Sequence, residues 1–364
     1  MIATAQLATG GLAIGLMAAA WSSPIGAADC GDSAGPGGTR VECLCGDSVV
    51  TDTRIAPDDG VVNEQCGETG LVVASPAITL DCDGLALRGT TSPDLSGAGV
   101  VIAADGGVVQ RCTVSGFDSG IRANQGLREN RIRSNTVVGN LLFGIVLNSS
   151  SQSHHVIDNV AEDNGEVGIQ INSLAYDVHV IGNVASGHPI AGIQFNSEAR
   201  QNQILLNQVS GEGERGIQFN SSAERNFVSS NTVDGGDLGI NFNSEALDNA
   251  LIRNVVTGTG LAAIRFNSGG QSNNITQNLL SDNRGEGVRI EEEATGNLLR
   301  SNLVFGNDDD GIEVCGVDNE VDSNEAWFNG EWDICAAAGN SDAGNNAGEV
   351  TFECPIPPDC EPLL

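Results

Sequence analysis

Polar side chains recur at one position of a repeat about 24 residues long, directly after a small residue and a branched aliphatic residue. In chain order this column is Arg122, Val146, Gln170, Gln194, Gln218, Asn241, Arg265, Arg289 and Glu313. An amide side chain both donates and accepts hydrogen bonds, which suits sugar hydroxyl groups. The Gln and Asn residues of the column are therefore the predicted substrate-binding residues.

The charged end of the column is the candidate catalytic region, and its members are Arg265, Arg289 and Glu313. Two arginines on neighbouring strands would lie about 5 Å apart and would repel each other unless an anion lay between them. Glu291, Glu313 or a substrate carboxylate could be that anion. The alternative is a solvated ladder of alternating charge on an ordinary face. If the face binds a glycan, Arg289→Ala is expected to weaken binding or turnover without a cost in stability.

The sequence requires no cofactor, and calcium is the one metal ion that the acidic residues suggest. Glu291 and Glu293 follow the arginines closely and could supply oxygen ligands. The run from Asp308 to Asp310 could do the same, although such a run is more often a solvated surface. No metal site is assigned from these patterns.

Four histidines are present: His154, His155, His179 and His188. His154 stands where other repeats carry asparagine, so we interpret it as a member of a structural ladder. A copper or zinc site formed by His154, His155 and His179 is the alternative, because imidazole is a common ligand of both metals.

The elements that must position these residues are short β-strands. Apolar residues come in alternating pairs such as Ile193 and Phe195, and Gly, Asn, Asp and Ser interrupt the chain every few residues. Asparagine recurs on the same period at Asn135, Asn159, Asn183, Asn207, Asn231, Asn254, Asn278 and Asn302. A period in the twenties indicates a solenoid. Inward phenylalanines of consecutive coils, and the asparagines of each column, should then stack.

Three segments carry a resemblance to a known family. "ENRIRSNTVVGNLLFGIVLNSS" and "RNFVSSNTVDGGDLGINFNSEALDN" resemble the right-handed parallel β-helix repeats of the pectin-lyase-like superfamily. "GLVVASPAITLDCDGLALRG" is similar to the opening coils of its NosD-like, carbohydrate-binding and sugar-hydrolysis group. The resemblance implies an all-β chain forming one right-handed parallel β-helix, with a polysaccharide bound along the outer face of one sheet.

The enzymes of that superfamily suggest roles that this sequence matches only in part. Pectate lyases use an arginine as the base, and Arg265 or Arg289 could take that role. The sugar-hydrolase and epimerase motifs of the fold are incomplete here, and the chain has no lysine. No catalytic residue is therefore transferred from the family, and whether the protein is an enzyme stays open.

The two ends of the chain differ from its middle. Ten cysteines are confined to them: Cys30, Cys43, Cys45, Cys66, Cys82, Cys112, Cys315, Cys335, Cys354 and Cys360. We expect them to form disulfides in an oxidising compartment, which would be the extracellular space, the periplasm or the cell surface. The predicted organisation is a disulfide-rich cap over residues 29–69, the β-helix over 70–335, and a second disulfide-rich cap over 336–364.

Residues 1–28 are uncharged and largely apolar, which is typical of a secretory signal peptide cut before Asp29. Because its first residues lack Lys and Arg, an uncleaved anchor is the alternative. After cleavage we expect no insertion into a membrane and a monomeric protein.

The net charge of −32 bears on the choice of partner. A strongly acidic surface repels nucleic acid and anionic lipid, so neither is expected to bind. The predicted function is binding of a polysaccharide, and whether the protein also cleaves it stays open. The alternative is a non-catalytic, acidic surface, matrix or adhesion protein.

Overall fold

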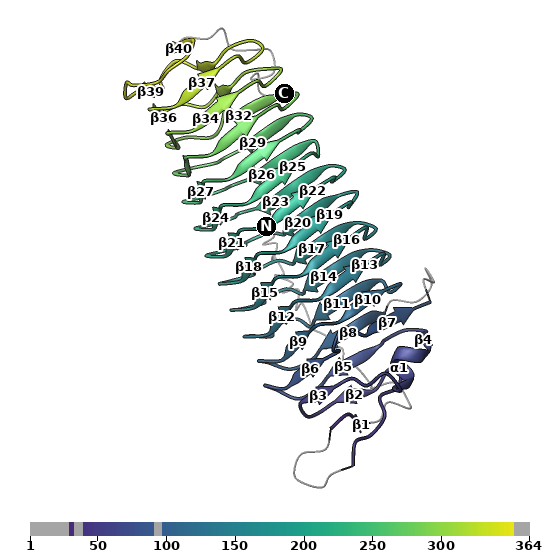
Figure 1. The fold of residues 1–364 in the computed structure, drawn as a ribbon. Helices are drawn as coiled ribbons and strands as arrows, with labels where there is room; N and C mark the ends of the chain where they lie inside the picture. The colour runs from purple at the N-terminus through teal and green to yellow at the C-terminus, as the bar shows by residue number, and fades with distance from the viewer. Residues whose placement is uncertain (1–28, 33–38, 91–96, 353–364) are drawn as a thin grey trace, which may run out of the picture.

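The computed structural model describes residues 29–32, 39–90 and 97–352, which form an elongated right-handed parallel β-helix (Figure 1). Its three sheets run along the length of the rod, and each complete coil contributes one strand to each sheet. All pairings between named strands are parallel, with Ile145, Ile169 and Ile193 in register on consecutive coils. The fold class predicted from the repeat is therefore confirmed.

Sheet A has 15 strands and carries the polar column on its outer face. Its strands are β1 (Asp29–Cys30), β2 (Ser48–Val49), β5 (Leu71–Val73), β8 (Ala98–Ile102), β11 (Ser119–Ala123), β14 (Phe143–Leu147), β17 (Val167–Ile171), β20 (Ala191–Phe195), β23 (Arg215–Ser221), β26 (Leu238–Ser244), β29 (Ala262–Phe266), β32 (Glu286–Ile290), β35 (Ile312–Val314), β38 (Ile334–Ala336) and β40 (Val350–Phe352).

Sheet B has 12 strands, each of which precedes a strand of sheet A along the chain. They are β4 (Gln65–Cys66), β7 (Ala86–Gly89), β10 (Thr113–Ser115), β13 (Thr136–Val138), β16 (Val160–Glu162), β19 (Val184–Ser186), β22 (Gln208–Ser210), β25 (Thr232–Asp234), β28 (Val255–Thr257), β31 (Leu279–Ser281), β34 (Leu303–Phe305) and β37 (Glu325–Trp327).

Sheet C has 13 strands, each of which follows a strand of sheet A. They are β3 (Thr53–Arg54), β6 (Thr79–Asp81), β9 (Val108–Gln110), β12 (Arg131–Arg133), β15 (His155–Ile157), β18 (His179–Ile181), β21 (Gln203–Leu205), β24 (Phe227–Ser229), β27 (Ala250–Ile252), β30 (Asn274–Thr276), β33 (Leu298–Arg300), β36 (Glu320–Asp322) and β39 (Ser341–Asp342).

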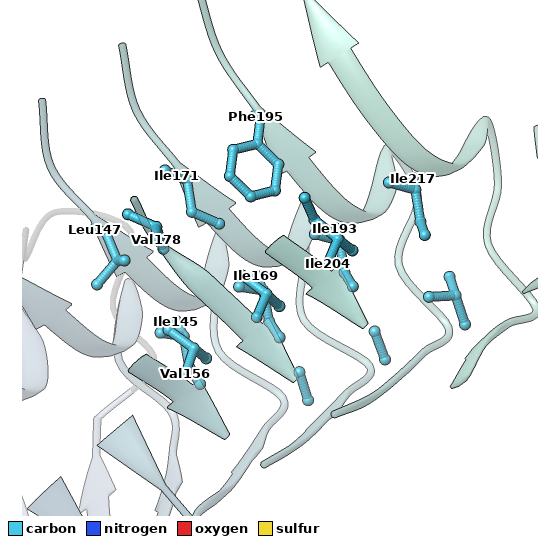
Figure 2. Close-up of a cluster of buried hydrophobic side chains, with 14 of the residues drawn as sticks. Ile145, Leu147, Val156, Ile169, Ile171, Val178, Ile193, Phe195, Ile204 and Ile217 are labelled. Carbon is cyan, nitrogen blue, oxygen red and sulfur yellow. The ribbon is translucent and has the colours of Figure 1, made fainter. Parts of the chain in front are cut away.

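The core is a stack of equivalent aliphatic and aromatic side chains (Figure 2). Along each strand of sheet A the alternate residues point inward, so coil after coil places the same side-chain position at the same depth. Phe195, Phe219, Phe242 and Phe266 are fully buried, and their rings stack with centroids 4.9, 4.5 and 4.7 Å apart. The predicted phenylalanine column is confirmed.

Asparagine ladders join the coils at the turns. In the predicted column, Asn183 donates its side-chain amide to Asn207 Oδ1 at 3.0 Å, and Asn207 donates to Asn231 Oδ1 at 2.9 Å. The same Oδ1 atoms accept backbone N–H groups, so each side chain satisfies buried donors of the coil before it. A ladder the sequence analysis did not single out includes Asn283, Asn307 and Asn329.

Disulfides stabilise the N-terminal end. They join Cys30 to Cys43, Cys45 to Cys66, and Cys82 to Cys112. Helix α1 (Gly60–Asn63) packs next to β7 at this end. Cys315 and Cys335 are also disulfide-bonded. Cys354, Cys360 and the predicted signal peptide lie outside the described residues.

Parallel strands extend from β1 to β40. Strands therefore lie on both sides of the predicted domain boundaries at residues 69/70 and 335/336. The division of the chain into two caps and a β-helix stays a prediction. Among the described residues no helix has the length and apolar character needed to cross a membrane.

Replacing Phe219 by alanine should cost about 3–5 kcal/mol of unfolding free energy, because it removes a buried ring from the middle of the stack. Denaturant unfolding measures this difference. Phe328→Ala is the control: Phe328 is 90% exposed, so its loss should change stability by about 0.5 kcal/mol or less. Equal effects of the two substitutions would contradict the assignment of the stack as core.

Candidate functional site

The charged residues of the polar column meet on the outer face of sheet A, towards the C-terminal end of the rod. Arg265 on β29, Arg289 on β32 and Glu313 on β35 are in register on three consecutive coils. Each lies between two inward apolar residues, as Arg289 lies between Val288 and Ile290. Strand alternation alone therefore directs all three side chains outward.

Arg289 is the centre of an ion-pair network. Its Nη1 atom lies 2.5 Å from Glu286 Oε1 and 3.2 Å from Glu313 Oε2, and its Nε atom lies 3.0 Å from Glu291 Oε1. Arg265 binds the same Glu291 oxygen through Nη2 at 2.6 Å and Nε at 2.9 Å. We call these five residues the Arg289 cluster. The anion predicted to lie between the two arginines is Glu291.

The cluster changes the expectation for Arg289. Its side chain is only 12% exposed, and the carboxylates of Glu313, Glu286 and Glu291 raise its pKa despite its burial. A guanidinium held in this way does not readily release a proton, so the geometry favours a charged, positioning group over a base. Removing it would leave buried carboxylates unpaired, and stability would not stay unchanged.

Two carboxyl groups have raised pKa values: Glu313 within the cluster, and Asp310, whose charge acts on Glu313. Burial raises the pKa of Glu313 to about 7, with Glu286, Asp310 and Glu291 adding to the rise and Arg289 opposing it. Burial raises the pKa of Asp310 to about 6, and Asp309, Glu331 and Glu286 add to it. A carboxylic acid that stays protonated near neutral pH can act as a proton donor.

A cavity of about 380 Å³ opens next to the cluster. Its lining residues are Gly260, Leu261, Ala262, Arg265, Arg284, Gly285, Glu286, Arg289 and Asp309. Arg284 is exposed and has no ion pair within the described part of the chain. The cavity thus offers donors, acceptors and one uncompensated cation to a polar ligand.

The four side chains predicted to bind substrate lie on the same face of sheet A but differ in solvent exposure. Gln170 and Gln194 are partly exposed, whereas Gln218 and Asn241 are buried. Asn241 Nδ2 donates to Gln218 Oε1 at 2.8 Å, and Gln170 Nε2 donates to Asn172 Oδ1 at 2.8 Å. Much of the hydrogen-bonding capacity of these amides is therefore used within the protein.

Arg265, Arg289, Glu291 and Glu313 were identified from the sequence, and Asp310 was named only within a run of possible calcium ligands. Glu286 was not identified. Glu286 lies at the start of β32, three residues before Arg289, and pairs with Ala262 of β29. Asp310 lies in the turn before β35 and accepts the backbone N–H of Trp332 at 2.7 Å. Spacing within the repeat did not indicate Glu286, because it stands three residues before Arg289 and strand alternation alone would place the two side chains on opposite faces.

The acidic residues provide one group of potential cation ligands. Within the described residues, Asp309, Asp310 and Glu331 have ligand atoms within 4.8 Å of one another. The calcium candidates Glu291 and Glu293 are not in this group. Glu291 is held by two guanidinium groups, whereas Glu293 is exposed.

The histidines fall into two kinds. His154 Nδ1 accepts the backbone N–H of Asn130 at 3.0 Å, in the position of a ladder asparagine, as predicted. His188 is buried between Asn164 and Glu212 in another ladder. By contrast, His155 and His179 face outward on neighbouring strands of sheet C.

Comparison with family models gives two overlapping matches, over residues 87–264 and 175–324, to a family described as "Periplasmic copper-binding protein (NosD)". Together they span more than half of the chain. The chain belongs to the NosD family. The disulfides and the family description indicate a periplasmic or extracellular location.

Solved structures similar to this NosD-family chain share its fold. The Dettilon tailspike protein has a TM-score of 0.55 at 14% identity, covering 84% of this chain and 66% of its own. A mutant of the periplasmic alginate epimerase AlgG has a TM-score of 0.51 at 13% identity, covering 84% of each chain. The catalytic domain of a GH87 alpha-1,3-glucanase in complex with tetrasaccharides has a TM-score of 0.53 at 9% identity, covering 84% of this chain and 68% of its own. Comparison with curated protein sequences gives no match.

The family description raises the question of which residues of this NosD-family chain could hold copper. No cysteine is free, so soft thiolate ligands are not available in the described residues. His154 and His188 are buried within ladders. His155 and His179 are the remaining imidazoles, and imidazole suits copper. The donor set therefore fits copper at this outward pair, where these residues would bind the ion and water could complete its coordination.

Proposed function

We propose that this protein is an exported, monomeric β-helix protein that binds a polysaccharide along the outer face of sheet A and cleaves it at the Arg289 cluster. The observation that carries the proposal is a cavity lined by Arg289, whose guanidinium lies 3.2 Å from the high-pKa carboxyl group of Glu313. The similar structures include a polysaccharide epimerase and a glucanase, which supports a sugar ligand at the level of the fold.

Each part of the site has a proposed role. Gln170 and Gln194 bind sugar hydroxyls on the face leading to the cavity. Arg284 and Arg265 bind an electronegative group of the sugar in the cavity. Glu313 donates its proton to the glycosidic oxygen as the bond between that oxygen and the anomeric carbon breaks, and water adds to the carbon and releases a proton to solvent. Arg289 positions Glu313 and stabilises its carboxylate until Glu313 is protonated again.

A non-catalytic role is the second candidate, and a specific observation favours it. The amides of the column bond to one another and to neighbouring asparagines, as Gln218 Nε2 donates to Asn220 Oδ1 at 3.0 Å. Such a ladder stabilises the rod without any ligand. Under this interpretation the protein is an acidic surface or adhesion molecule, and the Arg289 cluster is a structural ion-pair network.

A polysaccharide panel separates the two candidates. The disulfide-bonded protein is incubated with neutral and acidic polysaccharides, with calcium or with a chelator, and both product formation and retention on each polymer are recorded. We expect turnover of one polymer. Retention without turnover would support the binding role alone, and neither result on any polymer would reject the proposed function.

A further inference from the structure

Two outward-facing histidines lie on sheet C, away from the strands that carry the Arg289 cluster. His155 on β15 and His179 on β18 are in register, and their ring centroids are 4.7 Å apart in an edge-to-face arrangement. Both rings are partly exposed, with 23% of the His179 side chain accessible. The pair is therefore open to a solute.

The repeat does not require histidine at these positions. In the same outward column, Arg131 precedes His155 and Gln203 follows His179. Neither ring takes part in an asparagine ladder, and no hydrogen bond to a ring nitrogen of His155 is found within the described residues. The structural explanation that accounts for His154 and His188 thus does not extend to this pair.

A carboxylate already orients one of the rings. Asp177 Oδ1 lies 3.2 Å from His179 Nε2, and Asp177 Oδ2 accepts a hydrogen bond from Ser153 Oγ at 2.8 Å. A histidine that binds a metal through one ring nitrogen commonly donates the other N–H to a carboxylate, which fixes the ring and makes it a better ligand. Asp177 is placed for that role, leaving His179 Nδ1 as the ligand atom.

The spacing of the pair suits one shared ion. Strands of a sheet lie about 4.8 Å apart, and histidine nitrogens bind at about 2.0–2.1 Å from a metal. Modest side-chain rotation can therefore direct one nitrogen of each ring to a common point.

We infer that His155 and His179 bind one Cu²⁺ ion, with Asp177 orienting His179. The pair gives a residue-level location to the metal named in the family description, and it is independent of the proposed glycan site. Two imidazoles with solvent in the other positions favour Cu²⁺ over Zn²⁺, because Cu²⁺ forms the more stable complexes with such ligands.

The test is titration of the tag-free, disulfide-bonded protein with Cu²⁺ by calorimetry, with electron paramagnetic resonance of the complex. We expect one tight equivalent whose spectrum shows imidazole nitrogen coupling. His155→Gln and His179→Gln should each weaken binding at least about tenfold, since glutamine fits this column at Gln203. Asp177→Asn should weaken it about 10-fold or more.

The matched control is His154→Asn, which restores the ladder residue at a buried histidine next to the site. It should leave Cu²⁺ affinity and the spectrum unchanged. Circular dichroism checks that every variant is folded. Unchanged copper binding in the His155→Gln/His179→Gln double variant, an equal loss in His154→Asn, or tighter binding of Zn²⁺ than Cu²⁺ would each overturn the assignment.

Discussion

Replacing Glu313 by glutamine is expected to lower polysaccharide turnover by about 10²–10⁴-fold, the range that general acid catalysis contributes. Glutamine has nearly the shape of protonated glutamate but cannot donate a proton to a leaving oxygen. Arg289 keeps its contacts with Glu286 and Glu291 in this variant. The measurement is the initial rate of product formation on the polymer that the panel identifies.

The control is Glu293→Gln, which removes an exposed carboxylate close to the cluster and should leave the rate unchanged. Retention of each variant on the polymer separates binding from chemistry. A Glu313→Gln variant that turns over at the rate of the parent protein would remove Glu313 from the reaction.

The rate should also follow the protonation of Glu313. Its pKa is raised to about 7, so the acid form is present below that pH and turnover should fall above it. The free energy of unfolding should also fall as the pH rises. The raised folded-state pKa favours the native state at low pH, and this contribution is lost between about pH 4.5 and 7. In Glu313→Gln this part of the pH dependence should be absent.

Replacing Arg289 by alanine is expected to cost about 3–5 kcal/mol of unfolding free energy at pH 8, because it leaves buried carboxylates without their shared cation. Glu286 and Glu313 have side chains that are only 10% and 6% exposed. Protonation relieves their repulsion, so the loss should be smaller at pH 5 than at pH 8. Denaturant unfolding at the two pH values measures it.

Arg284→Ala is the matched control for this prediction. Arg284 lines the same cavity but is exposed and has no ion pair among the described residues. Its removal should change stability by about 0.5 kcal/mol or less. An Arg289→Ala protein as stable as Arg284→Ala at pH 8 would contradict the interpretation of Arg289 as the centre of a buried network.

The repeat made the fold predictable from the sequence. Every coil buries the same apolar pair, so the inward position of Phe219 could be inferred from that of Phe195 and Phe242. The same argument gave the ladder of Asn183, Asn207 and Asn231, since a buried amide needs a partner and the coil above supplies one. In a solenoid the residues that meet are those one period apart, and spacing alone identifies them.

By itself the sequence therefore determined the parallel β-helix, its stacked core, its ladders and the column that joins Arg265, Arg289 and Glu313. Only the tertiary structure decided which carboxylates surround Arg289, because Glu286 reaches it from the start of β32, at a position that strand alternation would place on the other face. It also showed that His155 faces outward beside His179, although it is adjacent in the chain to the buried ladder residue His154. Burial and side-chain direction set the pKa and the available ligand atoms, and these depend on contacts between coils.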